Sequence, residues 1–212
     1  MQKMIVWLNK PNIDSVRNIE SVLEQLNQTE YGSHYIIVYP NLANLRDLYS
    51  RYFKTEIEEN DMIVLILPFY ETTDSVRRIL SEDNAAEGTS IDVTKYEKHH
   101  SLIIVDSARA YFGSSSSADL VSFIKSLAKY AKQTGRNGVC ALCDIGSFYH
   151  SRLKVDGLIA HEASLPSKFD MNIKAFCLYH KADYDNRFTR EQKQVLLEHH
   201  GREIRIKVWV AN

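Results

Sequence analysis

Hydrophobic positions follow two alternating spacings along the chain. Continuous apolar runs, rich in β-branched and aromatic residues, predict buried strands at 34–40, 62–69, 101–106, 138–143 and 173–179. Between these runs, apolar residues recur every three or four positions and predict helices at 41–60, 72–80, 120–131, 153–165 and 189–201. An alternating segment at 204–210 predicts a final strand, and 91–93 predicts a short edge strand.

This alternation of strands and helices sets the expected fold class. Strands that are apolar throughout are typical of a parallel sheet covered on both faces, and repeated strand–helix units wind such a sheet. We therefore expect an α/β fold of three layers, a mostly parallel sheet with helices on both faces. Asn41, Thr72 or Thr73, and Thr189 are expected to begin helices, and Gly201 to end one. The polar segments 81–90 and 114–117 predict loops.

The first 30 residues stand apart from this pattern. Residues 4–8 predict an extra strand, and apolar positions from Ile13 to Leu26 predict an amphipathic helix. We expect this helix to pack on the rest of the domain, with a dimerisation arm as the alternative. The expected organisation is a strand and helix extension at 1–30, followed by the α/β domain at 31–212.

Composition narrows the class of function and the compartment. The formal net charge of -1 gives no reason to expect direct binding to nucleic acid. No segment approaches the roughly 20 apolar residues that span a bilayer, so no membrane association is expected. The 3 cysteines, an odd number, do not suggest a disulfide framework. We expect a cytoplasmic location.

The loop after the first main strand lacks the residues for P-loop nucleotide hydrolysis. A P-loop needs G-x-x-x-x-G-K-[ST] there, but residues 39–45 read YPNLANL, with no glycine and no lysine. The segment 102–106 does fit the apolar strand and aspartate that hold magnesium in P-loop ATPases, a pattern common among buried strands. Hydrolysis is therefore not expected. Asn41 is interpreted as a simple helix cap, with anion binding at that helix N-terminus as the alternative.

Acidic or aromatic residues follow nearly every predicted strand. Ligands of wound α/β sheets bind beyond the carboxyl ends of the strands, where the loops converge. These strand ends predict a crevice lined by Tyr39, Asn41, Tyr70, Glu71, Asp106, Arg109, Asp144 and His180. Aromatic rings with a few polar groups suit a small, partly apolar ligand. The alternative is that the tyrosines only cap the core. No cofactor or metal ion is expected.

The cysteines and the other histidines offer little further chemistry. Cys140 and Cys143 have the spacing of a redox or metal pair, but positions i and i+3 of a strand face opposite sides. All three cysteines are therefore expected to be buried as small hydrophobic side chains, with a reversible redox sensor as the alternative. The pairs His99–His100 and His199–His200 lie in polar surroundings and are expected to be exposed. His180 is interpreted as a structural histidine, with a ligand contact or proton sensor as the alternative.

Several blocks of sequence, in their order, resemble one known family. Residues 34–80, 101–113, 164–184 and 192–201 resemble the MEDS domain, a sensory domain found in a dichloromethane-responsive repressor and in archaeal histidine kinases. The resemblance implies a fold like that of the RecA and KaiC ATPases, with a degraded phosphate loop. It also implies a sensory module that recognises small organic compounds. No helix-turn-helix or kinase core is evident. A stand-alone sensor would signal through a partner, such as a histidine kinase or transcription regulator, or through self-association; the alternative is that the sequence is a fragment.

Three hypotheses for function result. The leading one is a non-catalytic sensory domain that binds a small organic ligand in the strand-end crevice and relays to a partner. The alternative is an interaction or assembly scaffold, derived from a RecA-like ATPase fold, that binds no ligand and forms a homo-oligomer. The third is an enzyme in which Glu71, Asp106 and Asp144 hold a metal ion. Because no phosphate-binding element accompanies these acids, we do not expect an enzyme.

Overall fold

Six parallel strands form the centre of the molecule. The computed structural model describes residues 18–82, 88–113, 118–150 and 154–207. In this part of the chain the strand order is β3-β2-β4-β5-β1-β6, and neighbouring strands are parallel throughout. The strands are β1 (His34–Tyr39), β2 (Met62–Leu67), β3 (Leu102–Ile104), β4 (Gly138–Asp144), β5 (Ile173–His180) and β6 (Arg202–Arg205). The expected parallel sheet is confirmed.

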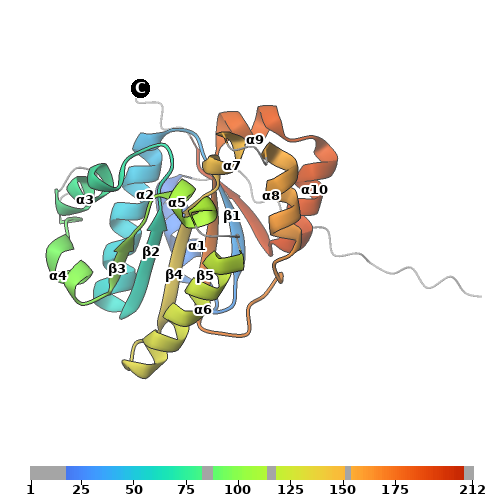
Figure 1. Cartoon of the computed structure of the whole chain (residues 1–212). Helices are drawn as coiled ribbons and strands as arrows, with labels where there is room; N and C mark the ends of the chain where they lie inside the picture. The colour runs from blue at the N-terminus through green and yellow to red at the C-terminus, as the bar shows by residue number, and fades with distance from the viewer. Residues whose placement is uncertain (1–17, 83–87, 114–117, 151–153, 208–212) are drawn as a thin grey trace, which may run out of the picture.

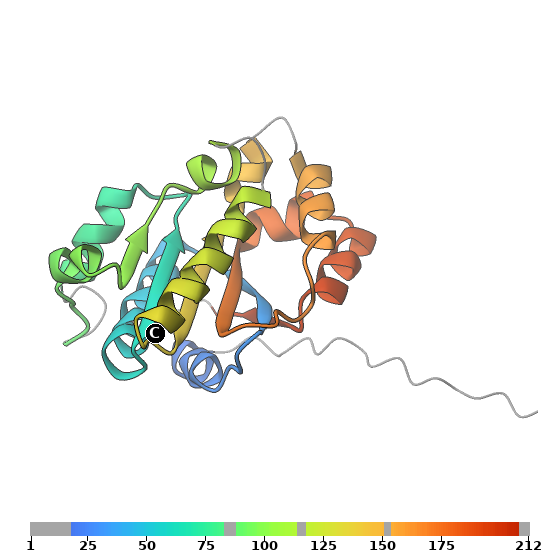
Figure 2. The same ribbon diagram turned by 60° about the horizontal axis from the view of Figure 1, so that its bottom comes forward.

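Helices cover both faces of this sheet, as Figures 1 and 2 show. One layer contains α1 (Ile19–Asn27), α2 (Leu42–Lys54) with a π-helical extension (Thr55–Glu59), α3 (Thr73–Ser81) and α4 (Val93–Lys98). The other contains α5 (Ser107–Phe112), α6 (Ala118–Gln133), α7 (Gly146–His150), α8 (Lys154–Ala163), α9 (Lys181–Arg187) and α10 (Arg190–His199). A cluster of buried apolar side chains lies under each layer, which confirms the three-layer α/β fold. No helix in the described ranges is both long and apolar enough to cross a membrane.

Side-chain capping explains why several helices begin where the sequence predicts. Asn41 Oδ1 accepts a hydrogen bond from the backbone N–H of Asn44 at 3.0 Å, and Thr72 caps α3 in the same way. Thr189 forms a capping box with Gln192, in which each side chain accepts a hydrogen bond from the other residue's backbone. These contacts satisfy donors that a helix start would otherwise leave unpaired. The predicted beginnings of α2, α3 and α10 are confirmed.

The predicted edge strand at 91–93 is wrong. Asp92 Oδ1 accepts a hydrogen bond from the backbone N–H of Lys95 at 2.9 Å and begins α4. Ile91 and Val93 are buried against the core cluster of this face. Ile91 and Val93 are apolar because they anchor the start of α4 in the core. A segment of only three residues does not show whether it begins a helix or forms a short strand.

The end of α10 also differs from the prediction. Gly201 is not the C-cap: His200 follows the helix in an extended conformation, and the backbone N–H of Gly201 donates to the carbonyl oxygen of His34 at 2.8 Å. The chain therefore passes directly from α10 into β6. The sequence did not predict α5, α7 and α9, because helices of 6, 5 and 7 residues are too short to show a helical period.

The amphipathic segment near the N-terminus packs on the domain. Among the described residues, α1 begins after the capping Asn18, and Val22 and Leu26 are fully buried in the core shared with α2. Tyr52 of α2 donates a hydrogen bond to the carbonyl oxygen of Leu26 at 3.3 Å. α1 therefore packs on its own domain and does not form a free arm. The predicted strand at 4–8, the first positions of the predicted helix, the loop at 114–117 and the tail of the last strand lie outside the described residues.

Candidate functional site

A buried carboxyl group lies at the carboxyl end of the central strand β4. Asp144 is 2% exposed. Its Oδ2 accepts a hydrogen bond from the Tyr39 hydroxyl at 2.7 Å, and its Oδ1 accepts one from the backbone N–H of Gly146 at 2.8 Å. Burial raises the pKa of Asp144 to about 7, although these two hydrogen bonds act to lower it. The group can therefore exchange a proton near neutral pH.

Aromatic rings from other strand ends lie beside this carboxyl group. The imidazole centroid of His180 is 5.4 Å from the ring centroid of Tyr39 and 5.4 Å from that of Tyr70. The Tyr70 hydroxyl donates a hydrogen bond to Asp183 of α9, and Asp183 Oδ1 accepts one from Arg187 Nε at 2.5 Å. The structure thus brings together four of the residues expected at the strand ends, Tyr39, Tyr70, Asp144 and His180. We call these four side chains the strand-end cluster.

Glu71 borders the strand-end cluster but is engaged with α2. Its carboxylate accepts hydrogen bonds from Arg46 Nε at 2.9 Å and from the Tyr49 hydroxyl at 3.1 Å. Glu71, Tyr70 and Asp144 line one small cavity of about 10 Å³. A cavity of roughly 10–15 Å³ holds a single water molecule. The side chains of the protein therefore fill most of the predicted crevice.

The remaining predicted site residues have other roles. Asp106 is exposed, and its Oδ1 accepts a hydrogen bond from the backbone N–H of Arg109 at 2.8 Å, which caps α5. The Arg109 side chain borders a separate surface hollow beside Phe123. Asn41 caps α2. Among the described residues, no metal-ligand group contains the strand-end acids of the enzyme hypothesis.

Several residues near Asp144 were not predicted from the sequence to belong to the site. Ser107 Oγ donates a hydrogen bond to the carbonyl oxygen of Asp144 at 2.5 Å and lies 3.0 Å from Ser147 Oγ, which ties the ends of β3 and β4 together. Asp183 and Arg187 are one helical turn apart on α9. Asp183 and Arg187 follow β5 directly, and this position after a strand was the only feature of the sequence that could have pointed to them. They were missed because α9 was not predicted.

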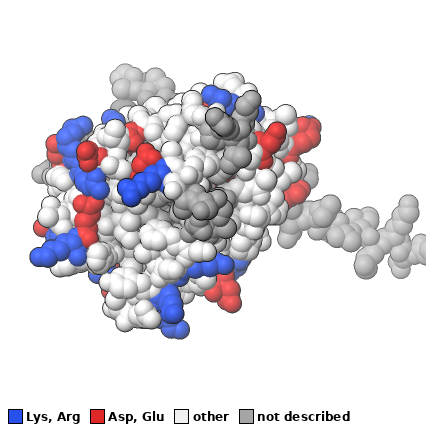
Figure 3. Space-filling model, viewed as in Figure 1, with Lys and Arg blue, Asp and Glu red and all other residues white. Residues whose placement is uncertain are grey.

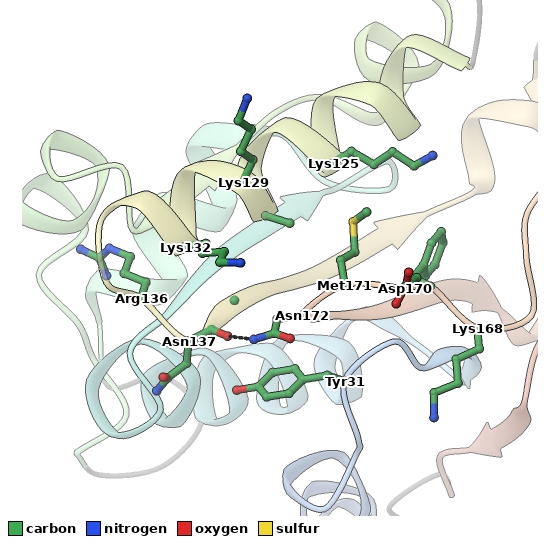
Figure 4. Close-up of a pocket in the computed structure, with 13 residues that line it drawn as sticks. Tyr31, Lys125, Lys129, Lys132, Arg136, Asn137, Lys168, Asp170, Met171 and Asn172 are labelled. Atoms are coloured by element: carbon green, nitrogen blue, oxygen red, sulfur yellow. Dashed lines mark hydrogen bonds between the residues drawn. The ribbon is translucent and has the colours of Figure 1, made fainter.

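A wider cavity lies at the opposite end of the sheet (Figure 4). Its volume is about 680 Å³, and it lies between α6, the start of β4 and the segment that leads into β5. Figure 4 shows Lys125, Lys129 and Lys132 along α6 on one side, and Tyr31 and Lys168 on the other. We call this cavity the basic groove, because its lining includes Lys125, Lys129, Lys132, Arg136 and Lys168 with Asp170 as the acidic member.

Charge is unevenly distributed over the face that carries α6. In Figure 3, Lys and Arg side chains are mixed with Asp and Glu at the left of the view, and further Lys and Arg side chains lie near the lower edge, where α6 ends in Figure 1. Arg136 in this region is paired with Asp61 at 3.0 Å, and Lys168 with Glu30 at 3.5 Å. The middle of the same face shows few charged side chains (Figure 3). The basic groove is therefore a local feature of a nearly neutral protein.

The cysteines follow the prediction, whereas the pair His199–His200 does not. All three cysteines are free and buried, and Cys140 and Cys143 belong to the core clusters of opposite sheet faces. His99 and His100 are exposed as expected, but His199 is partly buried. His200 is 2% exposed, so its predicted exposure is wrong. Its Nδ1 makes a 2.7 Å hydrogen bond to the carbonyl oxygen of Leu196, which turns the ring inward at the end of α10.

Fold and strand ends together define a parallel α/β domain whose first strand–helix loop carries no phosphate-binding residues. Residues 33–200 match the model of the MEDS family, the MEthanogen/methylotroph, DcmR Sensory domain. The match covers well over half of the chain, and the chain belongs to this family of sensory domains. No curated protein matches the sequence. The kinship to RecA and KaiC ATPases stays a prediction.

Proposed function

We propose that this chain is a non-catalytic sensory domain that binds a small organic molecule at the strand-end cluster and relays that binding to a partner. Membership of the MEDS family supports the sensory role. The observation that carries the binding site is the buried Asp144 carboxyl group, which lies among aromatic rings at the carboxyl end of a parallel sheet. Buried ionisable groups with shifted pKa values are concentrated at functional sites, and wound sheets bind ligands at this end.

The surroundings of Asp144 favour a particular ligand chemistry. Tyr39, Tyr70 and His180 present ring faces and edges, which suit an apolar group. The Asp144 carboxylate accepts two hydrogen bonds from the protein, and a carboxylate has about four acceptor positions. A ligand with a short apolar part and a hydrogen-bond donor would use both features. Short alcohols, amides and amines have this combination.

Binding at this place requires Tyr70 to move, because the cavity holds only about 10 Å³. Tyr70 is half-buried, and its hydroxyl is bound to Asp183. A ligand that displaces the Tyr70 ring would break that hydrogen bond. Asp183 would keep its contacts with His180, whose Nδ1 lies 3.7 Å from Oδ2, and with Arg187, which is exposed on α9. Occupancy would thus change the surface of α9. We propose this local exchange of contacts as the start of the relay.

Ligand screening on matched variants tests the proposal. A panel of one- to four-carbon alcohols, amides and amines would be screened by thermal shift and by ligand-observed NMR. We expect at least one class to raise the melting temperature of the wild type. Gly146→Ala should reduce this gain, because the added Cβ would lie 2.5 Å from Phe69 Cδ1 and 2.7 Å from Tyr70 Cε2. Arg109→Gln, which is exposed and outside the cluster, is the control and should bind as the wild type does. Failure of every class to bind the wild type, or equal binding by all three proteins, would contradict the site.

The basic groove favours a second role, binding of a partner protein. Lys125, Lys129 and Lys132 are exposed along one side of α6. A groove of about 680 Å³ lined by these cations is complementary to an acidic peptide segment. Because α6 also packs against the sheet face that carries Cys143 and Tyr179, it connects the two ends of the domain. We infer that the groove receives an acidic segment of the output partner.

Charge reversal tests this second role. A labelled glutamate-rich peptide would be titrated with the full chain and followed by fluorescence anisotropy at two salt concentrations. The double variant Lys129→Glu and Lys132→Glu should weaken binding at least roughly 10-fold, and salt should weaken binding to the wild type. Lys98→Glu, on exposed α4, is the matched control. An equal loss in the control, or equally tight binding of an oligonucleotide, would exclude an acidic-peptide groove.

A further inference from the structure

Four buried polar side chains from separate elements meet between the sheet and the layer of α8 and α10. His34 begins β1, Cys177 lies in β5, Glu162 lies in α8, and His200 follows α10. Their exposed fractions are 1%, 6%, 1% and 2% in that order. Figures 1 and 2 both show α8 and α10 side by side. This convergence is independent of the strand-end cluster.

Three of the distances among these side chains lie in the range of a tetrahedral metal site. His34 Nε2 lies 3.3 Å from Cys177 Sγ and 3.8 Å from Glu162 Oε2. His200 Nε2 lies 3.5 Å from the same Oε2. One ligand atom from each residue lies within 4.8 Å of all the others. Metal–ligand bonds of about 2.0–2.3 Å place tetrahedral ligand atoms roughly 3.3–3.8 Å apart. Small side-chain adjustments would therefore let one ion contact all four atoms.

Several polar atoms in this cluster have no hydrogen-bond partner. Both oxygens of Glu162 and Nε2 of His200 are buried without one, although buried polar atoms are almost always paired. His200 Nδ1 is bound to the carbonyl oxygen of Leu196 at 2.7 Å. The imidazole therefore carries its proton on Nδ1 and presents the Nε2 lone pair toward Glu162. A histidine held in this way by a backbone carbonyl is typical of metal ligands.

A divalent ion would also balance the charge of the cluster. Metal binding requires Cys177 as a thiolate, Glu162 as a carboxylate, and His34 and His200 as neutral imidazoles. A dication coordinated by a thiolate, a carboxylate and two neutral imidazoles leaves no net charge in the interior, which avoids the cost of an unpaired buried charge.

We propose that His34, Glu162, Cys177 and His200 bind one divalent cation of the zinc class. Thiolate and imidazole ligands favour Zn²⁺ over Mg²⁺ or Ca²⁺, which prefer oxygen ligands. Because the protein fills all four positions of a tetrahedron, the site is structural rather than catalytic. The ion joins β1 and β5 to the helical pair α8 and α10. A small apolar cavity of about 40 Å³ reaches His34 and Cys177 from between α6 and α8 and offers an approach to the site.

Metal binding to the chelator-treated full chain tests this proposal. Zn²⁺ would be titrated by calorimetry, and Co²⁺ would be used as a spectroscopic substitute. We expect one equivalent to bind, with a thiolate-to-cobalt charge-transfer band, the strong visible bands of tetrahedral cobalt, and a higher melting temperature. Absence of the thiolate band in the wild type, or a stoichiometry without a single tight equivalent, would overturn the proposal.

Matched variants assign the ligands. Cys177→Ser should remove the charge-transfer band, and His200→Gln should weaken Zn²⁺ binding at least roughly 100-fold. Cys143→Ser and His161→Gln are the controls, because both residues are buried on the same sheet face but lie outside the ligand set. Both controls should keep the band and the affinity. If Cys143→Ser loses the band, the proposal fails. If Cys177→Ser does not fold, the band in the wild type and in Cys143→Ser still identifies the thiolate ligand. A band that persists in Cys143→Ser leaves Cys177 as its source, because the third cysteine, Cys140, faces the core on the other side of the sheet.

Discussion

Replacing Asp144 with asparagine removes a buried carboxyl group whose pKa is raised from 3.8 to about 7. Between these two values the folded chain holds the proton more tightly than the unfolded chain does. This contribution to stability is therefore fully present below about pH 4 and is lost as the pH rises through 7. With about 1.4 kcal/mol for each unit of pKa, and part of the loss already complete at pH 5, the wild type should lose about 2.5 kcal/mol from this group between pH 5 and pH 8.

The asparagine variant has no proton to lose at this position. At pH 5 the wild-type carboxyl group is protonated, and the asparagine amide has the same pattern of donor and acceptor: its oxygen can accept from Gly146 and its NH2 group can donate to the Tyr39 hydroxyl oxygen. Asp144→Asn should therefore be close to the wild type in stability at pH 5. By pH 8 the variant should be more stable than the wild type by about 2.5 kcal/mol, because only the wild type has to lose its proton in the folded state. Glu162 titrates in the same window, but it is present in both proteins and cancels in the difference.

Urea unfolding followed by far-ultraviolet circular dichroism, at each pH unit from 5 to 8, measures this difference. Asp185→Asn is the control. Burial acts to raise the pKa of Asp185, but hydrogen bonds from Lys181 and Arg205 outweigh it, and the net shift is downward. Its contribution is lost only as the pH falls below the usual carboxylate range, so this variant should differ from the wild type by a constant amount between pH 5 and 8. A constant difference for Asp144→Asn would refute the reasoning.

Three further changes probe the fold. Lys174→Met should lower the unfolding free energy by about 3–5 kcal/mol, because it leaves the fully buried Glu56 carboxylate without the ammonium group 2.9 Å away. In a double-mutant cycle measured by urea unfolding, adding Glu56→Gln should recover much of this loss. Gly32→Ala should lower the melting temperature more than Gly135→Ala does, although both glycines have positive φ. A Cβ at Gly32 would lie 2.4 Å from a backbone oxygen, whereas a Cβ at Gly135 would have no neighbour within 4 Å. Thr189→Ala should cost about 1 kcal/mol in urea unfolding through loss of the capping box, and an unchanged midpoint would count against that role.

Local patterns made much of the fold predictable. The runs of β2 and β4 are buried on both faces, which produces a continuous apolar sequence that few other structures require. The proximity of Tyr39 and Asp144 was also predictable, since parallel strands end at one edge of the sheet. Asp106 satisfies the same strand-end pattern and yet caps α5. An aspartate after a strand looks the same in the sequence whether it belongs to a ligand site or caps the next helix. The pattern alone could therefore not separate Asp144 from Asp106.

Contacts between distant segments could not be predicted in this way. The Tyr70–Asp183 hydrogen bond joins residues 113 positions apart, and His34 and His200 lie with ring centroids 4.0 Å apart although they sit at opposite ends of the chain. Hydrophobic periodicity reports which face of an element is buried but not which element covers it. The polar surroundings of His200 in the sequence indicated solvent, whereas the turn into β6 brings the ring under α8.

The place of β1 in the sheet has a consequence for how the chain reaches its native state. This strand pairs with β5 and β6, so that His34 lies opposite Ala175 and Tyr35 opposite Arg202. During synthesis, β1 leaves the ribosome long before either neighbour exists. Its unpaired backbone N–H and C=O groups and its apolar side chains therefore stay exposed until most of the chain is made. This predicts slow folding governed by long-range contacts, and a risk of aggregation or chaperone binding in the interval. Assembly of the sheet around β1 is therefore expected to be among the last steps of folding.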